Sequence, residues 1–147
     1  MPNPRKAAPI VFLDANVLFS AAHTAEGRSA ALFSLARKRL CRLVISRYAV
    51  EEARRNLIDK KPEALKVFPK LLAWIFIHPE ADPKRLEQVN AVGLRDENDV
   101  PVLAAAIGRA DIFVTGDQKH FGPWMGQTIH GVKIMSLAQT LEHLLSK

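Results

Sequence analysis

Apolar positions along the chain alternate between two kinds of spacing. Short continuous runs of β-branched and aromatic residues occur at 10–13 (IVFL), 43–45 (LVI), 75–79 (IFIHP) and 112–115 (IFVT). Runs of this length are typical of strands that are buried on both faces. Pro79 is expected to end the third run, because proline has no amide hydrogen for a sheet ladder. The sequence therefore predicts strands at these four places.

The segments between the strands have apolar residues at helical spacing. Ser46 is expected to cap one helix, and Ser136 with Gln139 forms a capping box for the last one. A helix at 62–74 is expected to break at Pro69. The predicted helices begin after Asp14, Gly27, Ser46, Lys61, Pro83, Asp99 and Ser136.

Strands that alternate with helices predict a parallel sheet, because parallel neighbours require crossover connections. Both faces of such a sheet are covered by helices, so the predicted fold class is a three-layer α/β/α domain. A chain of 147 residues matches the usual size of one domain, and it has no repeat or long linker. We therefore expect a single domain spanning residues 1–147.

The composition of the chain limits where in the cell we expect the protein and which cysteine-based sites it can form. No stretch reaches the roughly 18 uncharged apolar residues that a membrane helix needs, and the first apolar run is too short for a signal peptide. We therefore expect a cytoplasmic protein with no membrane partner. The chain has one cysteine, Cys41, which excludes an intramolecular disulfide and a zinc site built from cysteines.

The net charge is positive. The chain has 21 Lys and Arg against 15 Asp and Glu, a formal charge of +6. This excess favours polyanionic partners such as nucleic acid, but many basic domains bind no such partner. Charge alone leaves the two interpretations equally open.

Acidic residues follow two of the predicted strands. Asp14 comes directly after IVFL, and Asp117 comes after IFVTG. The carboxyl ends of parallel strands meet at one edge of a sheet, where two nearby carboxylates repel each other unless a cation lies between them. A hard divalent ion such as Mg²⁺ would satisfy both. Taken singly, Asp14 and Asp99 could instead cap helices, and Asp117 could be a turn residue.

Four segments of the chain resemble the PIN-domain family, from VFLDANVL near the start through SRYAVEEARRNL and DENDVPVLAAAIGRADIFVTGD to VKIMSLAQTLEHL. The resemblance covers nearly the whole chain and is weakest at about 60–93. It implies a central, mostly parallel five-stranded sheet and a site of four acids. On this sequence the four acids fall at Asp14, Glu52, Asp99 and Asp117, which are the implied catalytic and metal-binding residues. Asn16 and Thr115 match polar residues that flank the first and last acids.

Two assignments stay open: the choice between Glu51 and Glu52, and the role of Asp96. Helical periodicity barely separates Glu51 from Glu52, because both lie away from the apolar face of their helix. The assignment of Glu52 depends on the resemblance. Asp96 is expected to be an outer-shell or capping residue near Asp99.

The resemblance further implies an endoribonuclease that uses Mg²⁺ or Mn²⁺ to activate water for attack on RNA. Basic residues near the acids are candidates for contacts with RNA phosphates. It also implies the toxin half of a bacterial toxin–antitoxin pair, with a cognate antitoxin protein and a homodimer as partners. The RNA-contact candidates are Arg47, Arg54, Arg55 and Lys119.

Two other interpretations remain. A phosphatase of the haloacid-dehalogenase type also has an aspartate after its first strand, but it requires a second aspartate two residues later, where this chain has Asn16. A catalytically inactive PIN-like module that binds RNA or protein would be expected to lack some of the four acids. All four positions are acidic here.

Overall fold

The computed structural model describes residues 8–24, 27–78, 99–107, 109–116 and 121–146, and for residues 99–102 it describes the backbone alone. The predicted helix after Pro83 lies outside these residues. None of the helices in the described ranges is long and apolar enough to cross a membrane.

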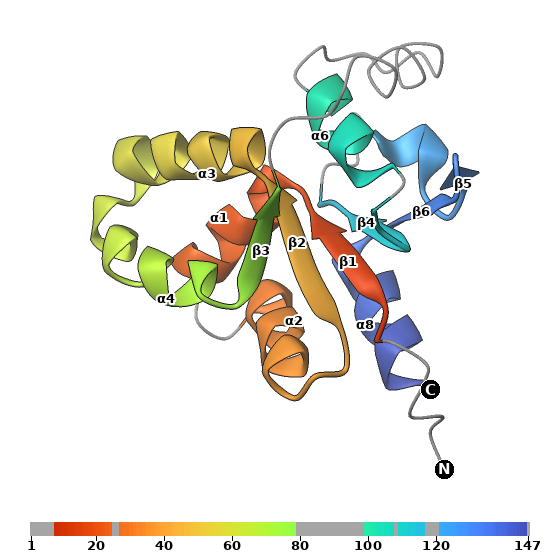
Figure 1. Ribbon diagram of the computed structural model, residues 1–147. Helices are drawn as coiled ribbons and strands as arrows, with labels where there is room; N and C mark the ends of the chain where they lie inside the picture. The colour runs from red at the N-terminus through yellow and green to blue at the C-terminus, as the bar shows by residue number, and fades with distance from the viewer. Residues whose placement is uncertain (1–7, 25–26, 79–98, 108, 117–120, 147) are drawn as a thin grey trace.

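The core of the fold is a mixed, mostly parallel sheet with the strand order β3-β2-β1-β4-β6-β5 (Figure 1). Every neighbouring pair is parallel except β5 and β6. The parallel strands β1 and β4 are short apolar runs whose residues are buried, except for the partly buried Ile10, as expected for strands covered on both faces. The strands are β1 (Ile10–Leu13), β2 (Arg42–Ser46), β3 (Ile75–His78), β4 (Ile112–Val114), β5 (Thr128–Ile129) and β6 (Val132–Met135).

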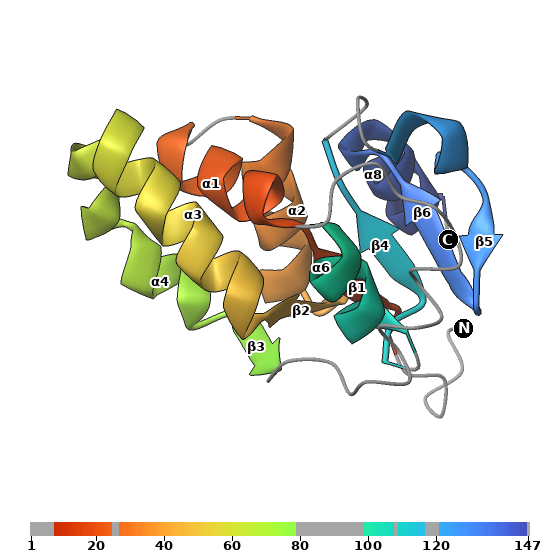
Figure 2. The same ribbon diagram turned by 90° about the horizontal axis from the view of Figure 1, so that it is seen from above.

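Helices lie on both sides of the sheet (Figures 1 and 2). Helices α1, α2 and α8 pack behind it in the view of Figure 1, and α6 lies on the side facing the viewer. The predicted three-layer arrangement is confirmed. The helices are α1 (Ala15–His23), α2 (Arg28–Arg37), α3 (Arg47–Lys60), α4 (Phe68–Leu72), α6 (Asp99–Ala106) and α8 (Leu137–Leu145), with 3-10 turns η1 (Pro62–Lys66) and η2 (Gly122–Trp124).

The sheet has one strand more than the five that we predicted. The extra strand, β5, is two residues long and pairs with β6 across His130 and Gly131. Both turn residues have positive φ, 48° and 86°, which is the geometry of a two-residue type I′ hairpin. A strand this short has no periodicity to detect, and His-Gly is not one of the residue pairs that usually mark a type I′ turn.

Several local predictions hold in the structure. Ser46 caps α3 by accepting a hydrogen bond from the Ala49 amide at 3.1 Å. Ser136 and Gln139 form the predicted reciprocal capping box of α8. The segment 62–74 differs from its prediction, because it divides at Val67 into η1 and α4. Pro69 does not end a helix there but occupies the first turn of α4, where its missing amide hydrogen costs nothing.

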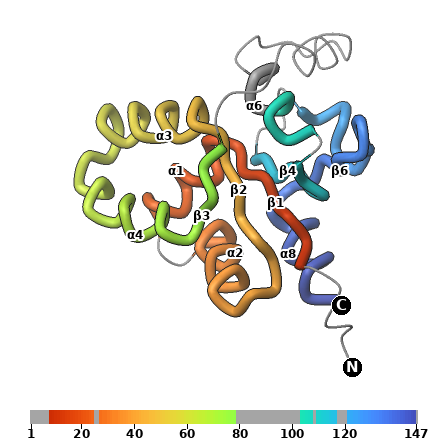
Figure 3. Tube along the Cα trace, in the orientation of Figure 1, coloured from red at the N-terminus to blue at the C-terminus, as the bar shows by residue number. Residues whose placement is uncertain are grey.

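Different segments of the chain lie at the carboxyl ends and at the amino ends of the parallel strands (Figure 3). The carboxyl ends of β1, β2 and β4 lead into α1, α3 and the residues Thr115 and Gly116, so these residues and helix starts meet at one edge. The amino ends of β2 and β3 follow the loops that leave α2 and α4. In an open parallel sheet the carboxyl edge is where polar side chains from different strands can converge.

Candidate active site

Asp14 occupies the junction between β1 and α1. Its backbone amide continues the sheet by donating to the Val114 carbonyl at 3.1 Å, and its Oδ1 accepts a hydrogen bond from the Ala15 amide at 2.8 Å. The residue is 5% exposed. A buried carboxylate at a helix N-terminus is stabilised by the positive end of the helix dipole. The capping role considered for Asp14 is therefore real, and it is compatible with a further role in catalysis.

Thr115 and Asn16 hold the other carboxylate oxygen. The Oγ1 of Thr115, a fully buried residue just after β4, donates to Oδ2 of Asp14 at 2.7 Å. The Nδ2 of Asn16 donates to the same oxygen at 3.2 Å. Charge-assisted hydrogen bonds of this kind are about twice as strong as neutral ones. Asp14 is thus fixed in one orientation by a side chain just after β4 and a side chain in the first turn of α1.

Asn16 also ties the site to the segment that leads toward Asp117. Its Oδ1 accepts a hydrogen bond from the Gly116 amide at 3.1 Å. The side chain therefore bridges the start of α1 to the chain just after β4. The sequence matched Asn16 to a flanking polar position but gave no sign of this second contact, because it joins residues 100 positions apart.

The structure separates the two candidate glutamates of α3. Glu51 is exposed, and its carboxylate lies 3.9 Å from the Arg54 guanidinium. Glu52 is half-buried and lies beside the buried Ala53 of the same helix. Glu52 also has an interaction partner in the structure. This placement favours Glu52 as the acid nearer the interior of the fold.

Of the other two predicted acids, the structure describes the backbone of Asp99 but not Asp117. The backbone of Asp99 begins α6, and α6 contacts α3, the helix that holds Glu52. Asp117 follows Gly116 in sequence but lies outside the described residues, as do Asp96 and Lys119. The convergence of four acids therefore remains a prediction. Across the described ranges, no group of three or more His, Cys, Asp or Glu residues is close enough to hold a metal ion.

The four candidate acids offer carboxylate oxygens as ligands for a metal ion. Asp14 presents a buried carboxylate at the carboxyl edge, and the other three candidates are also carboxylates. Oxygen-only donor sets suit Mg²⁺ and Mn²⁺, whereas zinc usually takes cysteine or histidine. The one cysteine, Cys41, is buried at the start of β2, at the opposite edge of the sheet from Asp14. The residues present therefore fit a hard divalent cation.

The predicted RNA-contact residues in α3 are all exposed. Arg47 is the first residue of α3, and Arg55 lies two turns further along the helix. The Arg54 guanidinium lies 5.6 Å from the centre of the Phe68 ring, a distance typical of a cation–π contact. Arg54 therefore has a packing role that the sequence did not predict.

His78 ends β3 at the same edge of the sheet, and the sequence analysis assigned it no role. It is in register with Ser46 of β2, and its ring lies 4.6 Å from the Phe76 ring. Burial, together with the nearby positive charge of Arg109, lowers the pKa of His78 below its usual value. The ring is therefore biased toward its neutral form. Its position near the end of a predicted strand, just before Pro79, was the one available signal.

A family model described as a PIN domain matches residues 10–119. Among solved structures, VapBC2 from Rickettsia felis bound to a promoter DNA fragment aligns with a TM-score of 0.66 and 17% identity, covering 86% of this chain and 98% of that one. DNA-bound VapBC from Salmonella typhimurium aligns with a TM-score of 0.65 and 16% identity over 90% and 99% of the two chains.

A third solved structure, PAE2754 from Pyrobaculum aerophilum, aligns with a TM-score of 0.65 and 17% identity, covering 99% of this chain and 100% of that one. At these identities the structural matches establish a shared fold. No curated protein sequence matches the chain.

Proposed function

Because the chain belongs to the PIN-domain family, we propose that it is a metal-dependent endoribonuclease that hydrolyses RNA phosphodiester bonds. The single observation that supports this most is the Asp14 carboxylate at the carboxyl end of β1. It is buried, and it is held by Thr115 just after β4 and by Asn16 in the first turn of α1. Orienting a carboxylate this tightly is what a catalytic metal ligand requires.

The four acids Asp14, Glu52, Asp99 and Asp117 would hold Mg²⁺ or Mn²⁺. When bound, such an ion lowers the pKa of a water nucleophile and stabilises negative charge on the scissile phosphate. Thr115 and Asn16 both act on Asp14 by keeping its Oδ2 in place. Asp96 is proposed to support Asp99 from outside the ligand shell.

RNA would approach this edge through basic side chains. Arg47 and Arg55 are exposed on α3, the helix that also holds Glu52. We assign them, with Arg54 and Lys119, to phosphate contacts, which position a substrate without reading its sequence. The charge of +6 supports a polyanionic substrate, because it raises the rate of encounter and the affinity at low salt.

We further propose a biological setting as the toxin of a toxin–antitoxin pair. The solved structures that share the fold include VapBC complexes from Rickettsia felis and Salmonella typhimurium. A cognate antitoxin protein would then be a partner of this chain, which would itself form a homodimer. Coexpression with the protein encoded by the adjacent gene, followed by size-exclusion chromatography, tests for such a partner.

Two other functions are less well supported by the site. A haloacid-dehalogenase-type phosphatase needs an ionisable group at position 16, and here the Asn16 amide is hydrogen bonded to both Asp14 and Gly116. An inactive PIN-like binding module would need Asp14 only as the cap of α1, a role that its Oδ1 fills, and would have no need for Thr115 and Asn16 to hold its Oδ2.

The test of the proposed function is a cleavage assay on a structured RNA and a single-stranded RNA. Cleavage should require added Mg²⁺ or Mn²⁺, stop in excess EDTA and resume when the metal is restored. Hydrolysis of a phosphomonoester without RNA cleavage would favour the phosphatase. RNA binding with no cleavage under any metal would favour the binding module.

A further inference from the structure

Part of the sheet face on the side of α6 has no described helix over it. Strand register places Phe12, Val44 and Phe76 side by side on that face. Phe12 is fully buried, whereas Phe76 on the edge strand β3 is 63% exposed. In Figure 1 the β3 and β2 ribbons face the viewer with no described helix in front of them. Trp74, just before β3, is also 48% exposed, and contiguous apolar patches rimmed by polar residues are a recurrent mark of binding surfaces.

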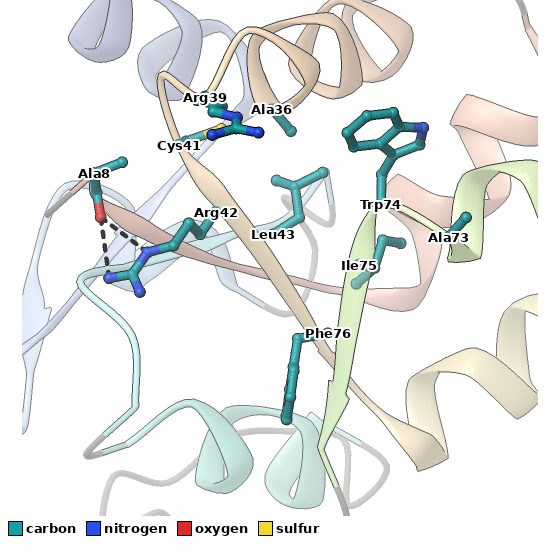
Figure 4. Close-up of a pocket in the computed structure, with 10 residues that line it drawn as sticks. All are labelled: Ala8, Ala36, Arg39, Cys41, Arg42, Leu43, Ala73, Trp74, Ile75 and Phe76. Atoms are coloured by element: carbon teal, nitrogen blue, oxygen red, sulfur yellow. Dashed lines mark hydrogen bonds between the residues drawn. The ribbon is translucent and has the colours of Figure 1, made fainter.

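Two adjoining hollows surround this ring. One has a volume of about 490 Å³ and is lined by Arg39, Arg42, Trp74 and Phe76, among others (Figure 4). The second has a volume of about 250 Å³ and is lined by Val44, Phe76, His78 and Arg109, among others. Arg42, Leu43 and Phe76 line both, so the hollows meet at these three residues. We call this continuous surface the β2–β3 face.

The charges on the β2–β3 face have one sign. Arg39, Arg42 and Arg109 line it, and among the described lining residues there is no Asp or Glu. The Arg42 guanidinium is held in place by two hydrogen bonds to the Ala8 carbonyl, at 3.4 and 3.3 Å. Asp111 accepts a hydrogen bond from the Ile10 amide and lines neither hollow. The surface therefore complements an anion that also has an apolar or aromatic part.

The backbone conformation of Arg39, which lines the first hollow, is also unusual. Arg39 follows α2 with φ of 63°, and the Leu40 amide donates to the Leu35 carbonyl in the pattern of a Schellman cap. Glycine is the usual residue at this position, because other side chains are disfavoured at positive φ. Arg39 therefore keeps this backbone conformation at some cost in free energy, with its side chain exposed at the rim of the first hollow.

Among possible occupants, the observations favour single-stranded RNA. A second copy of the chain would bring the three arginines against their own counterparts, and like charges oppose such a contact. A peptide adding to the sheet would pair along the edge of β3, whereas these side chains lie on its face. Exposed rings beside arginines are the arrangement that binds single strands, by stacking on bases and contacting phosphates.

The β2–β3 face also leads to the proposed active site. From Arg42 to Ser46, β2 rises about 13 Å, and Ser46 is in register with His78 at the carboxyl edge. The neighbouring strand β1 reaches the same edge at Leu13, just before Asp14. A strand of RNA lying on Phe76 would therefore continue toward Asp14.

We propose that the β2–β3 face binds a single-stranded segment of the RNA substrate, with a base stacked on Phe76 and phosphates on Arg39 and Arg42. This inference rests on the proposed function for the identity of the ligand. It adds a second contact region, distinct from α3 and from the acidic edge.

The test is the binding of fluorescein-labelled oligouridylate, measured by fluorescence anisotropy in EDTA so that no cleavage occurs. Phe76→Leu keeps an apolar side chain but removes the ring, and it should weaken binding by roughly 5-fold to 100-fold. Arg39→Gly should reduce the slope of log affinity against log salt by about 0.7, the value for one phosphate contact on a single strand. It should not unfold the protein, because glycine suits this backbone better than arginine.

Two matched variants control for charge and exposure. Lys38→Ala removes a neighbouring exposed cation that lines neither hollow, and Leu145→Ala removes an apolar side chain that is 64% exposed on α8. Both should bind oligouridylate like the parent protein. Equal losses in the controls and in the β2–β3 variants would overturn the inference.

The outcomes also separate this inference from the proposed nuclease. If the protein cleaves RNA with metal but Phe76→Leu and Arg39→Gly bind normally, the β2–β3 face is not an RNA site. If these variants lose binding and no metal supports cleavage, the RNA surface stands and the nuclease fails. If the variants change only the oligomeric state in analytical ultracentrifugation, the occupant is a second copy and the inference is wrong.

Discussion

The Oγ1 of Thr115 lies 2.7 Å from the Oδ2 of Asp14 and donates a hydrogen bond to it across 101 residues of sequence. This contact joins the carboxyl ends of β1 and β4, which are hydrogen-bonded neighbours in the sheet. Both residues are buried, so solvent does not compete strongly for the bond. The bond fixes the orientation of the Asp14 carboxylate, which is the proposed metal ligand.

The first prediction concerns this bond. Thr115→Val keeps the shape of the side chain but removes the donor, leaving a buried carboxylate oxygen less well satisfied. We expect the free energy of unfolding to fall by about 1.5–3 kcal/mol. We also expect the cleavage rate to fall by about 10-fold to 100-fold. Urea denaturation and steady-state cleavage measure the two effects. Thr115→Ser, which keeps the hydroxyl, should retain most of both, and equal losses in the two variants would argue against the bond.

The second prediction distinguishes the two glutamates of α3. Glu52→Gln should weaken Mn²⁺ binding and lower cleavage, because Glu52 is half-buried and is the proposed ligand. Glu51→Gln removes an exposed carboxylate that lies near Arg54, and such pairs contribute about 0–1 kcal/mol. Isothermal titration with Mn²⁺ compares the variants directly. A larger loss for Glu51→Gln would reverse the assignment.

Some features of this site could be predicted from the sequence because they are local. Asp14 directly follows a continuous apolar run, so its place at a strand end follows from the local sequence pattern alone. The Ser136 capping box is likewise a pattern of four adjacent residues. The resemblance supplied Asn16 and Thr115 as flanking residues but not their shared contact with one carboxylate oxygen.

Other features depend on tertiary contacts that no local pattern encodes. The choice between Glu51 and Glu52 requires knowing which side of α3 faces the interior near α6. The contact of Arg54 with Phe68 joins α3 to α4, and the division of segment 62–74 at Val67 places Phe68 for that contact. The hairpin strand β5 exists because two turn residues adopt positive φ.

The third prediction uses the one thiol. Burial raises the pKa of Cys41 from 9.0 to about 11, so the folded state favours the neutral thiol. The stability contributed by this shift is present below pH 9.0 and is lost as pH rises from 9.0 toward about 11. Urea denaturation across this range should show a steeper loss for the parent protein than for Cys41→Ala. Identical pH profiles for the two proteins would contradict the raised pKa.

The central claim is that Asp14 is a metal ligand of an RNA-cleaving site, and Asp14→Asn tests it most directly. Asparagine keeps the size of the side chain and its ability to cap α1, so the metal-free variant should remain folded, with its unfolding free energy changed by no more than about 2 kcal/mol.

The decisive measurement is the cleavage of one RNA by the parent protein and by Asp14→Asn, each with Mn²⁺ and with excess EDTA. Circular dichroism confirms that both proteins are folded. The account predicts cleavage by the parent protein with Mn²⁺ alone, and none by the variant in either condition. Full cleavage by folded Asp14→Asn, or undiminished cleavage by the parent protein in EDTA, would contradict it.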